Sequence, residues 1–218
     1  MEKTSLTQLL NVKYPIIMAP MFLVTNTKMM IEAINSGIAA CIPALNYRTD
    51  EQFREAIQEI RANTTSKGLG INLIVNKSNI KVQQQLKTCV DLGVDFIITS
   101  LGSPKEVIEQ CKPKGIKVLC DVVEEKYAKK VEELGADAVI AVNCNAGGHA
   151  GKLKPEEIIP LLNKYCNIPV ISAGGIGTKD GIDTIMNLGA AGLSIGSPFI
   201  ACEEAHISKE YKQACVDY

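Results

Sequence analysis

The sequence predicts an α/β fold of the (β/α)8 barrel class, also called a TIM barrel, with parallel strands. Two observations lead to this prediction. Eight short apolar segments recur along the 218 residues, and segments with a helical period separate them. The apolar residues within each segment are consecutive rather than alternating, which is typical of strands buried on both faces of a parallel sheet. A doubly wound open sheet is the alternative, but it typically uses fewer strands, whereas eight strands close a barrel.

The predicted strands are rich in β-branched residues, as buried strands usually are. They span Pro15–Ala19, Ile38–Ile42, Leu69–Ile74, Asp95–Thr99, Ile116–Cys120, Ala138–Val142, Pro169–Ala173 and Gly192–Ile195. Division of the 218 residues by eight gives about 27 residues per unit, near the length of a minimal strand–helix–turn unit. Barrels of this class usually have about 250 residues. We therefore expect one domain over residues 1–218, a barrel that is short or incomplete at its C-terminus.

The predicted helices follow from the period of their apolar residues and from residues typical of helix ends. They include Asp50–Arg61, Ile80–Leu92, Glu124–Leu134, Lys179–Leu188 and a last helix at Ser208–Val216. Thr49 and Thr178 are expected N-caps, and Ser103 followed by Pro104 is a further helix start. Three helices end in Leu-Gly before a strand, in LGVDF, LGADAVI and LGAAGLSI, where glycine permits the left-handed turn that reverses the chain.

Composition excludes several classes of protein. The chain has 23 Lys+Arg and 24 Asp+Glu, a net charge of −1, so it has no general attraction for nucleic acids or anionic membranes. No apolar run approaches the roughly 18 to 20 residues of a spanning helix, and the first residues do not resemble a secretion signal. We expect a cytoplasmic protein without nucleic-acid or membrane partners. The eight cysteines include no CxxC pair, so we expect reduced thiols and no metal site.

Strand exits are where the chemistry of a barrel is expected. Asn72, Ser100 and Asp121 stand at the exits of the third, fourth and fifth strands. The seventh strand is followed by the glycine-rich turn AGGIG and the eighth by IGSPF. Turns at these two positions often bind phosphate through bare backbone N–H groups, and neither contains Lys or Arg. The alternative is that these glycines serve only to make tight turns.

His149 is the candidate catalytic residue. It lies after the sixth strand in the loop NAGGHAG, between Gly148 and Ala150, where glycines would let a ligand approach an imidazole. The alternative is a histidine whose ring is satisfied by hydrogen bonds within the loop. His206, in a polar segment, is expected on the surface. Paired carboxylates, a GxSxG elbow and a P-loop are all missing from the sequence. One base among backbone donors indicates a bound phosphate-bearing cofactor that carries the difficult chemistry.

Five segments resemble one family. PIIMAPM, GINLIVN, NAGGHAG, IPVISAGGIG and GAAGLSIGSPFIACEEA occur in order along the chain, and together they are similar to the nitronate monooxygenases, formerly called 2-nitropropane dioxygenases. Those enzymes are FMN-dependent (β/α)8 barrels. AGGH is the most specific element, whereas the AGGI and IGS turns are shared with other FMN barrels. The flavin-dependent enoyl-ACP reductases are similar at the same places.

The resemblance implies an FMN cofactor, a small-molecule nitronate substrate and dioxygen as partner, and a homodimer is left open. His149 matches the catalytic histidine, which would remove the α-proton of a nitroalkane or orient a nitronate that is oxidised to a carbonyl compound and nitrite. The residues that would bind the cofactor are Ala19, Pro20 and Met21 along the flavin, Asn72 by a hydrogen bond, Gly147 beside the ring, and Gly174, Gly175, Ser194, Ile195, Gly196 and Ser197 at the phosphate.

Three departures from the family pattern accompany the resemblance. Asn145 stands where many relatives have an acidic residue, Val142 stands where the family often has a polar one, and the relatives continue well beyond Tyr218. We expect the family's C-terminal lid and small domain to be absent and the site to be more open. Two alternatives remain: an enoyl-thioester reductase that uses NAD(P)H, and a flavin-binding barrel without turnover.

Overall fold

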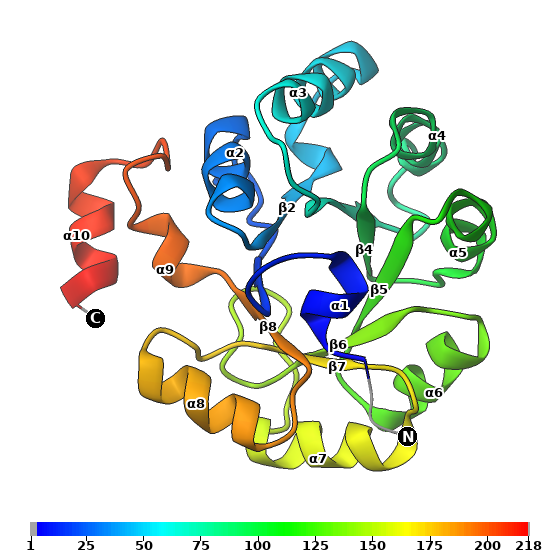
Figure 1. Cartoon of the computed structure of the whole chain (residues 1–218), viewed down its shortest axis with the longest axis vertical. Coiled ribbons are helices and arrows are strands. Elements are labelled where there is room, and N and C mark those ends of the chain that lie inside the picture. Colours follow the sequence, from blue (N-terminus) through cyan, green and yellow to red (C-terminus); the bar gives the residue numbers. More distant parts are fainter. Residues whose placement is uncertain (1–3, 218) are drawn as a thin grey trace.

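The computed structural model describes residues 4–217 and shows a closed barrel of parallel strands surrounded by helices (Figure 1). The strands are β1 (Ile16–Met18), β2 (Ala39–Pro43), β3 (Leu69–Ile74), β4 (Phe96–Ser100), β5 (Lys117–Val122), β6 (Ala138–Val142), β7 (Val170–Ala173) and β8 (Gly192–Ile195). Each strand pairs in parallel with the next, and β8 pairs with β1 to close the ring. The predicted (β/α)8 barrel is confirmed, and the open sheet is excluded.

Most of the helices form the outer layer of the barrel. They are α1 (Leu6–Leu10), α2 (Thr27–Asn35), α3 (Asp50–Ala62), α4 (Val82–Leu92), α5 (Lys105–Cys111), α6 (Glu125–Glu133), α7 (Pro155–Tyr165), α8 (Lys179–Asn187), α9 (Ser197–Ile200) and α10 (Lys209–Asp217), with short 3-10 helices η1 (Ala44–Asn46) and η2 (Lys112–Lys114). The helices predicted from periodicity begin and end within two residues of their expected bounds. The last one, α10, has no buried residue in the part of the chain described, and it lies outside α9 (Figure 1).

The predicted helix ends are formed as their residue types suggest. The backbone N–H of Gln52 donates to the hydroxyl of Thr49 at 3.3 Å, and that of Gly181 donates to Thr178 at 3.2 Å. Gly93, Gly135 and Gly189 adopt φ values of 61°, 97° and 91° at the expected exits. Each glycine therefore supplies the left-handed conformation that returns the chain to the next strand.

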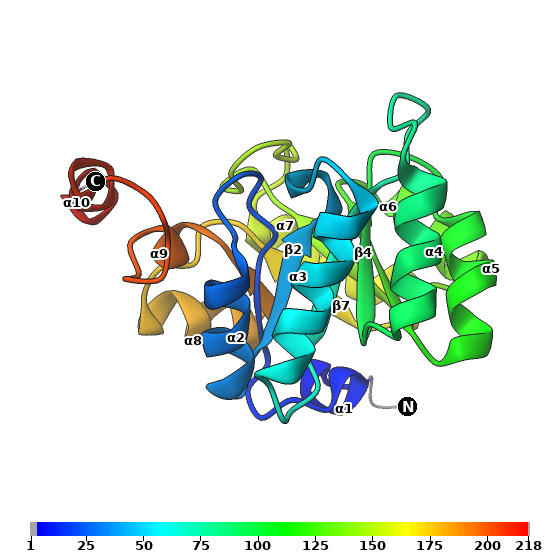
Figure 2. The same cartoon turned by 90° about the horizontal axis from the view of Figure 1, so that it is seen from above.

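The short helix α1 closes the N-terminal end of the barrel. Leu6 and Leu10 are buried and pack into the apolar interior, which is otherwise filled by side chains such as Ile17, Phe96 and Ile171. The backbone N–H of Leu6 also donates to the carbonyl oxygen of Ala191 at 2.9 Å. Figure 2 shows α1 at one end of the barrel and the loop tips at the other. Access to the interior is therefore limited to the end where the strands exit.

A second apolar layer lies between the strands and the surrounding helices, where side chains such as Met30, Ile57 and Ile159 are fully buried. All eight cysteines are free, and most lie within these two layers. Across residues 4–217, no helix combines the length and the apolar character needed to cross a membrane.

Candidate active site

The exits of β7 and β8 lie side by side at one rim of the barrel. Ala173 and Ser194 are partners in the parallel ladder, so the turns that begin at Gly174 and Gly196 leave neighbouring strands in the same direction. The N–H of Ala19 donates to the carbonyl oxygen of Ile195 at 2.8 Å, which brings the exit of β1 to the same place. The two glycine-rich turns are therefore neighbours, as the predicted phosphate site requires.

The loop that follows β6, residues 143–154, is held against the turn of β7 by one buried side chain. Asn143 has no exposed surface, and its carboxamide nitrogen donates to the carbonyl oxygen of Gly174 at 3.1 Å. Its oxygen accepts from the N–H of Asn145 at 2.8 Å. The N–H of Cys144 donates to the carbonyl oxygen of Leu153 at 2.9 Å and closes the loop. The loop that carries the candidate base is thus built on the β7 turn.

Gly174 and Gly175 are required by this packing. Their φ values are 114° and 71°, a region that other residues rarely adopt. A Cβ at Gly174 would lie 2.5 Å from the backbone nitrogen of Ala146, and one at Gly175 would lie 2.8 Å from Cβ of Asn145. Both glycines are therefore needed to form the turn itself, which supports the alternative that they serve to make a tight turn. Among the described residues their N–H groups donate to no protein acceptor, so both functions are compatible.

The turn after β8 is more open. A Cβ at Gly196 would be 3.8 Å from Cβ of Ala19 and 3.8 Å from Sδ of Met21, ordinary contact distances. Within residues 4–217, the N–H groups of Gly196 and Ser197 donate to no protein acceptor either. Ser194 is nearly buried beside Ala173 in the wall of the barrel. The two turns together offer unpaired backbone donors without a Lys or Arg, a donor set that fits a phosphate monoester.

His149 lies on the exposed part of the β6 loop. No hydrogen bond joins its ring to any residue that the structure describes, so the loop does not satisfy the imidazole. A Cβ at Gly147 or Gly148 would meet nothing within 4 Å, which leaves the backbone beside His149 open to a ligand. His206 is exposed on the segment between α9 and α10, as expected for a surface residue.

Three polar side chains form a chain inside the open end of the barrel. The carboxamide nitrogen of Asn72 donates to the hydroxyl of Ser100 at 2.8 Å, and that hydroxyl donates to the carboxylate of Asp121 at 2.5 Å. Burial raises the pKa of Asp121 to about 6, and the hydrogen bond from Ser100 lowers it in part. All three had been expected at strand exits, but Ser100 is the last residue of β4 and Asp121 lies within β5. Their connection was not predicted from the sequence.

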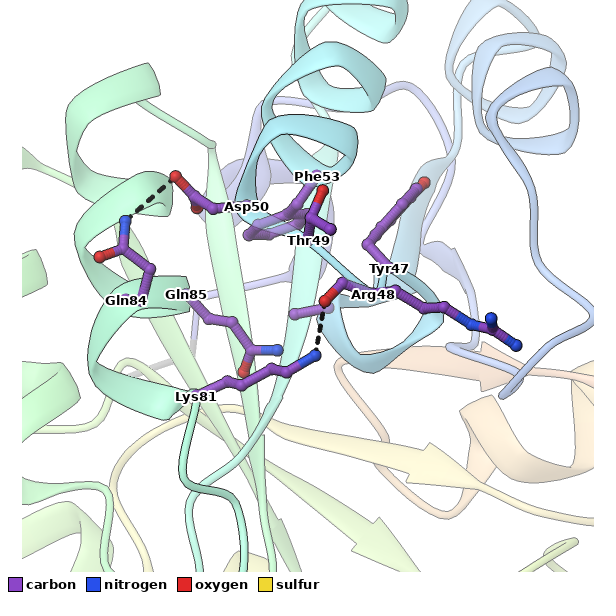
Figure 3. Close-up of a pocket in the computed structure, with 9 residues that line it drawn as sticks. Tyr47, Arg48, Thr49, Asp50, Phe53, Lys81, Gln84 and Gln85 are labelled. Carbon is purple, nitrogen blue, oxygen red and sulfur yellow. Dashed lines mark hydrogen bonds between the residues drawn. The ribbon is translucent and has the colours of Figure 1, made fainter.

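Two cavities lie beside the open end rather than inside it. One of about 200 Å³ lies between the starts of α3 and α4 and contains none of the predicted site residues (Figure 3). Its polar groups are partly paired with each other, since Lys81 Nζ donates to the carbonyl oxygen of Arg48 at 2.7 Å and Gln84 donates to Asp50 at 3.1 Å. The other, of about 290 Å³, is lined by residues 150–153 and by Val123 and Glu124. The His149 loop therefore borders a cavity as well as the rim.

Comparisons with known proteins agree with the barrel fold. The sequence model of a family described as nitronate monooxygenase matches residues 77–218. A probable nitronate monooxygenase of Staphylococcus saprophyticus is 31% identical over 258 aligned residues, which cover 97% of this chain and 72% of the relative. FabK from Thermotoga maritima has 30% identity and a TM-score of 0.89, with 98% of this chain and 67% of that chain covered. A nitroalkane oxidase from Streptomyces ansochromogenes, 23% identical with a TM-score of 0.84, has the same fold over 96% of this chain and 72% of its own.

Proposed function

Because the chain belongs to the nitronate monooxygenase family of flavin-dependent oxidoreductases, we propose that it binds FMN and oxidises alkyl nitronates with dioxygen to carbonyl compounds and nitrite. One observation carries the proposal. The loop that presents His149 is hydrogen-bonded through Asn143 to the glycine turn after β7. A ligand whose phosphate lies on that turn would therefore have an unpaired imidazole on the adjoining loop.

The residues that would hold FMN come from five strand exits. The N–H groups of Gly174, Gly175, Gly196 and Ser197 would donate to its phosphate, with Ser194 and Ile195 beneath them, while Ala19, Pro20, Met21, Asn72 and Gly147 would contact the rest of the cofactor. When bound, the flavin supplies the electron transfer between nitronate and dioxygen that no side chain can carry out.

His149 would act on the substrate in one of two ways. With a neutral nitroalkane, its imidazole would remove the α-proton as a general base, a role worth roughly 10²- to 10⁴-fold in rate. With a preformed nitronate, no proton has to be removed, and the imidazole would orient the anion. The two substrates therefore separate proton abstraction from binding.

The test is the rate of nitrite release by the yellow, FMN-loaded protein from 1-nitropropane and from its nitronate. His149→Ala should lower kcat/KM for the nitroalkane about 100-fold or more, and for the nitronate by a smaller factor. His206→Ala, which removes the other exposed histidine, should change neither rate. A His149→Ala protein that oxidises the nitroalkane as fast as the wild type would contradict the proposed role.

A second candidate is the flavin-dependent enoyl-thioester reductase, favoured by the likeness to FabK at 30% identity over 98% of this chain. The two reactions differ in electron source. Anaerobic addition of NADH should leave the flavin absorbance of a nitronate monooxygenase largely unchanged, whereas an enoyl-thioester reductase should bleach rapidly and recover with crotonyl thioester. Tight FMN binding with neither activity would indicate the third alternative, a barrel without turnover.

A further inference from the structure

The chain Asn72–Ser100–Asp121 lies across three adjacent strands inside the open end of the barrel. Asn72 is nearly buried, whereas Ser100 and Asp121 are partly exposed to the opening. The three side chains share the interior face, because Asn72 is the ladder partner of Ile98 and Asp121 is the partner of Ile140, both interior residues. The chemistry proposed above does not use Ser100 or Asp121.

The direction of every hydrogen bond in this chain is fixed. The carboxamide nitrogen of Asn72 also donates to the carbonyl oxygen of Ile98 at 3.1 Å, and a carbonyl can only accept. The Ser100 hydroxyl has a single proton, which the ionised carboxylate of Asp121 accepts. Ser100 must therefore receive its second hydrogen bond from Asn72. Both N–H bonds of the Asn72 carboxamide are thus used by the protein.

The remaining atom, Oδ1 of Asn72, accepts no hydrogen bond from any residue in the described range. Oδ1 also has some contact with solvent. In that range, the one completely buried side-chain N or O atom without a hydrogen-bond partner is the hydroxyl oxygen of Ser172. Oδ1 has no partner either, so it is not completely buried. Oδ1 is therefore an oriented acceptor at the open end of the barrel. A ligand group that contacts Oδ1 of Asn72 therefore has to be a hydrogen-bond donor.

We propose that Ser100 and Asp121 are positioning residues that hold the Asn72 carboxamide with Oδ1 turned to the flavin, so that Asn72 selects a donor group on the cofactor. This inference rests on the proposed function, since it takes the ligand at this end of the barrel to be a flavin. The oxidised flavin ring has one N–H donor, at N3, and the ribityl chain has hydroxyl donors.

The charge of Asp121 supports an orienting role. Within residues 4–217, no Lys or Arg forms an ion pair with Asp121 and the Ser100 hydroxyl is its one hydrogen-bond donor, so few groups offset its negative charge. The titratable groups beside it are the thiols of Cys41 and Cys120, whose pKa values the charge of Asp121 helps to raise. Burial raises the pKa of both thiols, which keeps them neutral. The direction of the Ser100 hydrogen bonds therefore depends on the ionisation of Asp121, whereas the bond to the carbonyl oxygen of Ile98 favours the same orientation of Asn72 in either state.

The experiment is the dissociation constant of FMN, measured by quenching of FMN fluorescence on protein from which flavin has been removed. Ser100→Ala should weaken binding about 3- to 10-fold, the effect of one hydrogen bond. Ser100→Thr keeps the hydroxyl and should restore the wild-type constant. Ser172→Ala removes the partnerless serine hydroxyl of β7, which takes no part in the chain, and should change nothing.

A double-mutant cycle separates positioning from a general structural effect. If Ser100 acts through Asn72, then Ser100→Ala should cause no further loss of FMN affinity in an Asn72→Ala background. Additive losses would overturn the proposal, as would a wild-type constant for Ser100→Ala. A wild-type protein that fails to bind FMN at all would instead contradict the proposed function, and this inference with it.

The pH profile provides a second readout with an isosteric variant. Protonated Asp121 can donate to Ser100, so the Ser100 hydroxyl proton becomes free to point at Asn72 and the bond to Ile98 alone then holds the carboxamide in its orientation. Wild-type FMN affinity should therefore fall more steeply below about pH 6 than that of Asp121→Asn. The FMN phosphate also titrates near pH 6, but it does so equally in both proteins, so the difference between the profiles reports Asp121. Parallel profiles would overturn the proposal.

Discussion

Asn143 and Gly174 are joined by a hydrogen bond of 3.1 Å from the carboxamide nitrogen of one to the carbonyl oxygen of the other. This bond crosses from the exit of β6 to the exit of β7 and is fully buried on the Asn143 side. It couples the position of the His149 loop to the glycine turn proposed to hold the phosphate. The loop that carries His149 is therefore fixed to the β7 turn at its first residue.

Asn143→Ala should lower the free energy of unfolding by about 1–3 kcal/mol, because the backbone groups of Gly174 and Asn145 lose their buried partner. Limited proteolysis should cut the loop 143–154 faster than in the wild type. Asn145→Ala removes an exposed neighbouring carboxamide and should leave the unfolding midpoint nearly unchanged. Equal stability of the Asn143→Ala and Asn145→Ala proteins in urea would show that the bond does not anchor the loop.

Gly174→Ala should be strongly destabilising, by about 2 kcal/mol or more. The residue would have to adopt a φ of 114° and place its methyl group against the Ala146 backbone. Gly177→Ala, in the same turn, is the matched control, because a Cβ there would meet nothing within 4 Å and φ is not positive. Thermal unfolding of the two variants measures the difference, and a Gly174→Ala protein as stable as the control would contradict the described packing.

Asp121→Asn should make the apo-protein more stable at pH 7. The pKa of Asp121 is raised from 3.8 to about 6, so the folded protein holds this proton more tightly than the unfolded chain. The wild type therefore loses stability as the pH rises from about 4 to 6, and this contribution is absent in Asp121→Asn. A shift of about 2 pKa units corresponds to nearly 3 kcal/mol, which solvent at the partly exposed carboxylate reduces to about 1–2 kcal/mol. Urea unfolding should show a gain at both pH 5 and pH 7, about half as large at pH 5; a loss at pH 7 would mean that the charge is stabilising.

Leu101 is an exposed leucine with a φ of 59°, in the loop after β4. Leu101→Gly should raise the unfolding free energy by about 0.5–1 kcal/mol, since glycine adopts this conformation without steric cost. The melting temperature should rise by about 1–4 °C. Leu45→Gly, at a comparably exposed leucine without a positive φ, should instead lower it. A melting temperature of Leu101→Gly below that of the wild type would indicate that contacts of the leucine side chain stabilise the protein by more than its positive φ destabilises it.

Most of the barrel could be predicted because each strand and helix carries a local signal. Three strands, β3, β6 and β8, have the predicted bounds, and the Leu-Gly exits have the expected backbone conformation. The helix α1 was missed because five residues are too few to show a period, and so short a helix is stabilised by docking rather than by its own residues. A signal was available, since Ser5 and Gln8 form a capping box at its start.

The site could be predicted only as far as the order of strands determines it. Gly174 and Gly196 had to be neighbours once the barrel closed, because β7 and β8 are adjacent. The bond from Asn143 to Gly174 depends on the path of an irregular loop, which no periodicity encodes. The chain from Asn72 to Asp121 depends on the register between β3, β4 and β5, and a shift of one residue would place these side chains on the outer face.

The central claim is that backbone donors at the exits of β7 and β8 bind the phosphate of a flavin. The most direct test is calorimetric titration of the flavin-free protein with FMN and with riboflavin, which lacks the phosphate. Several charge-assisted hydrogen bonds to the phosphate should make FMN bind about 100-fold or more tightly than riboflavin. Equal affinities for the two ligands, or no binding of either, would contradict the account.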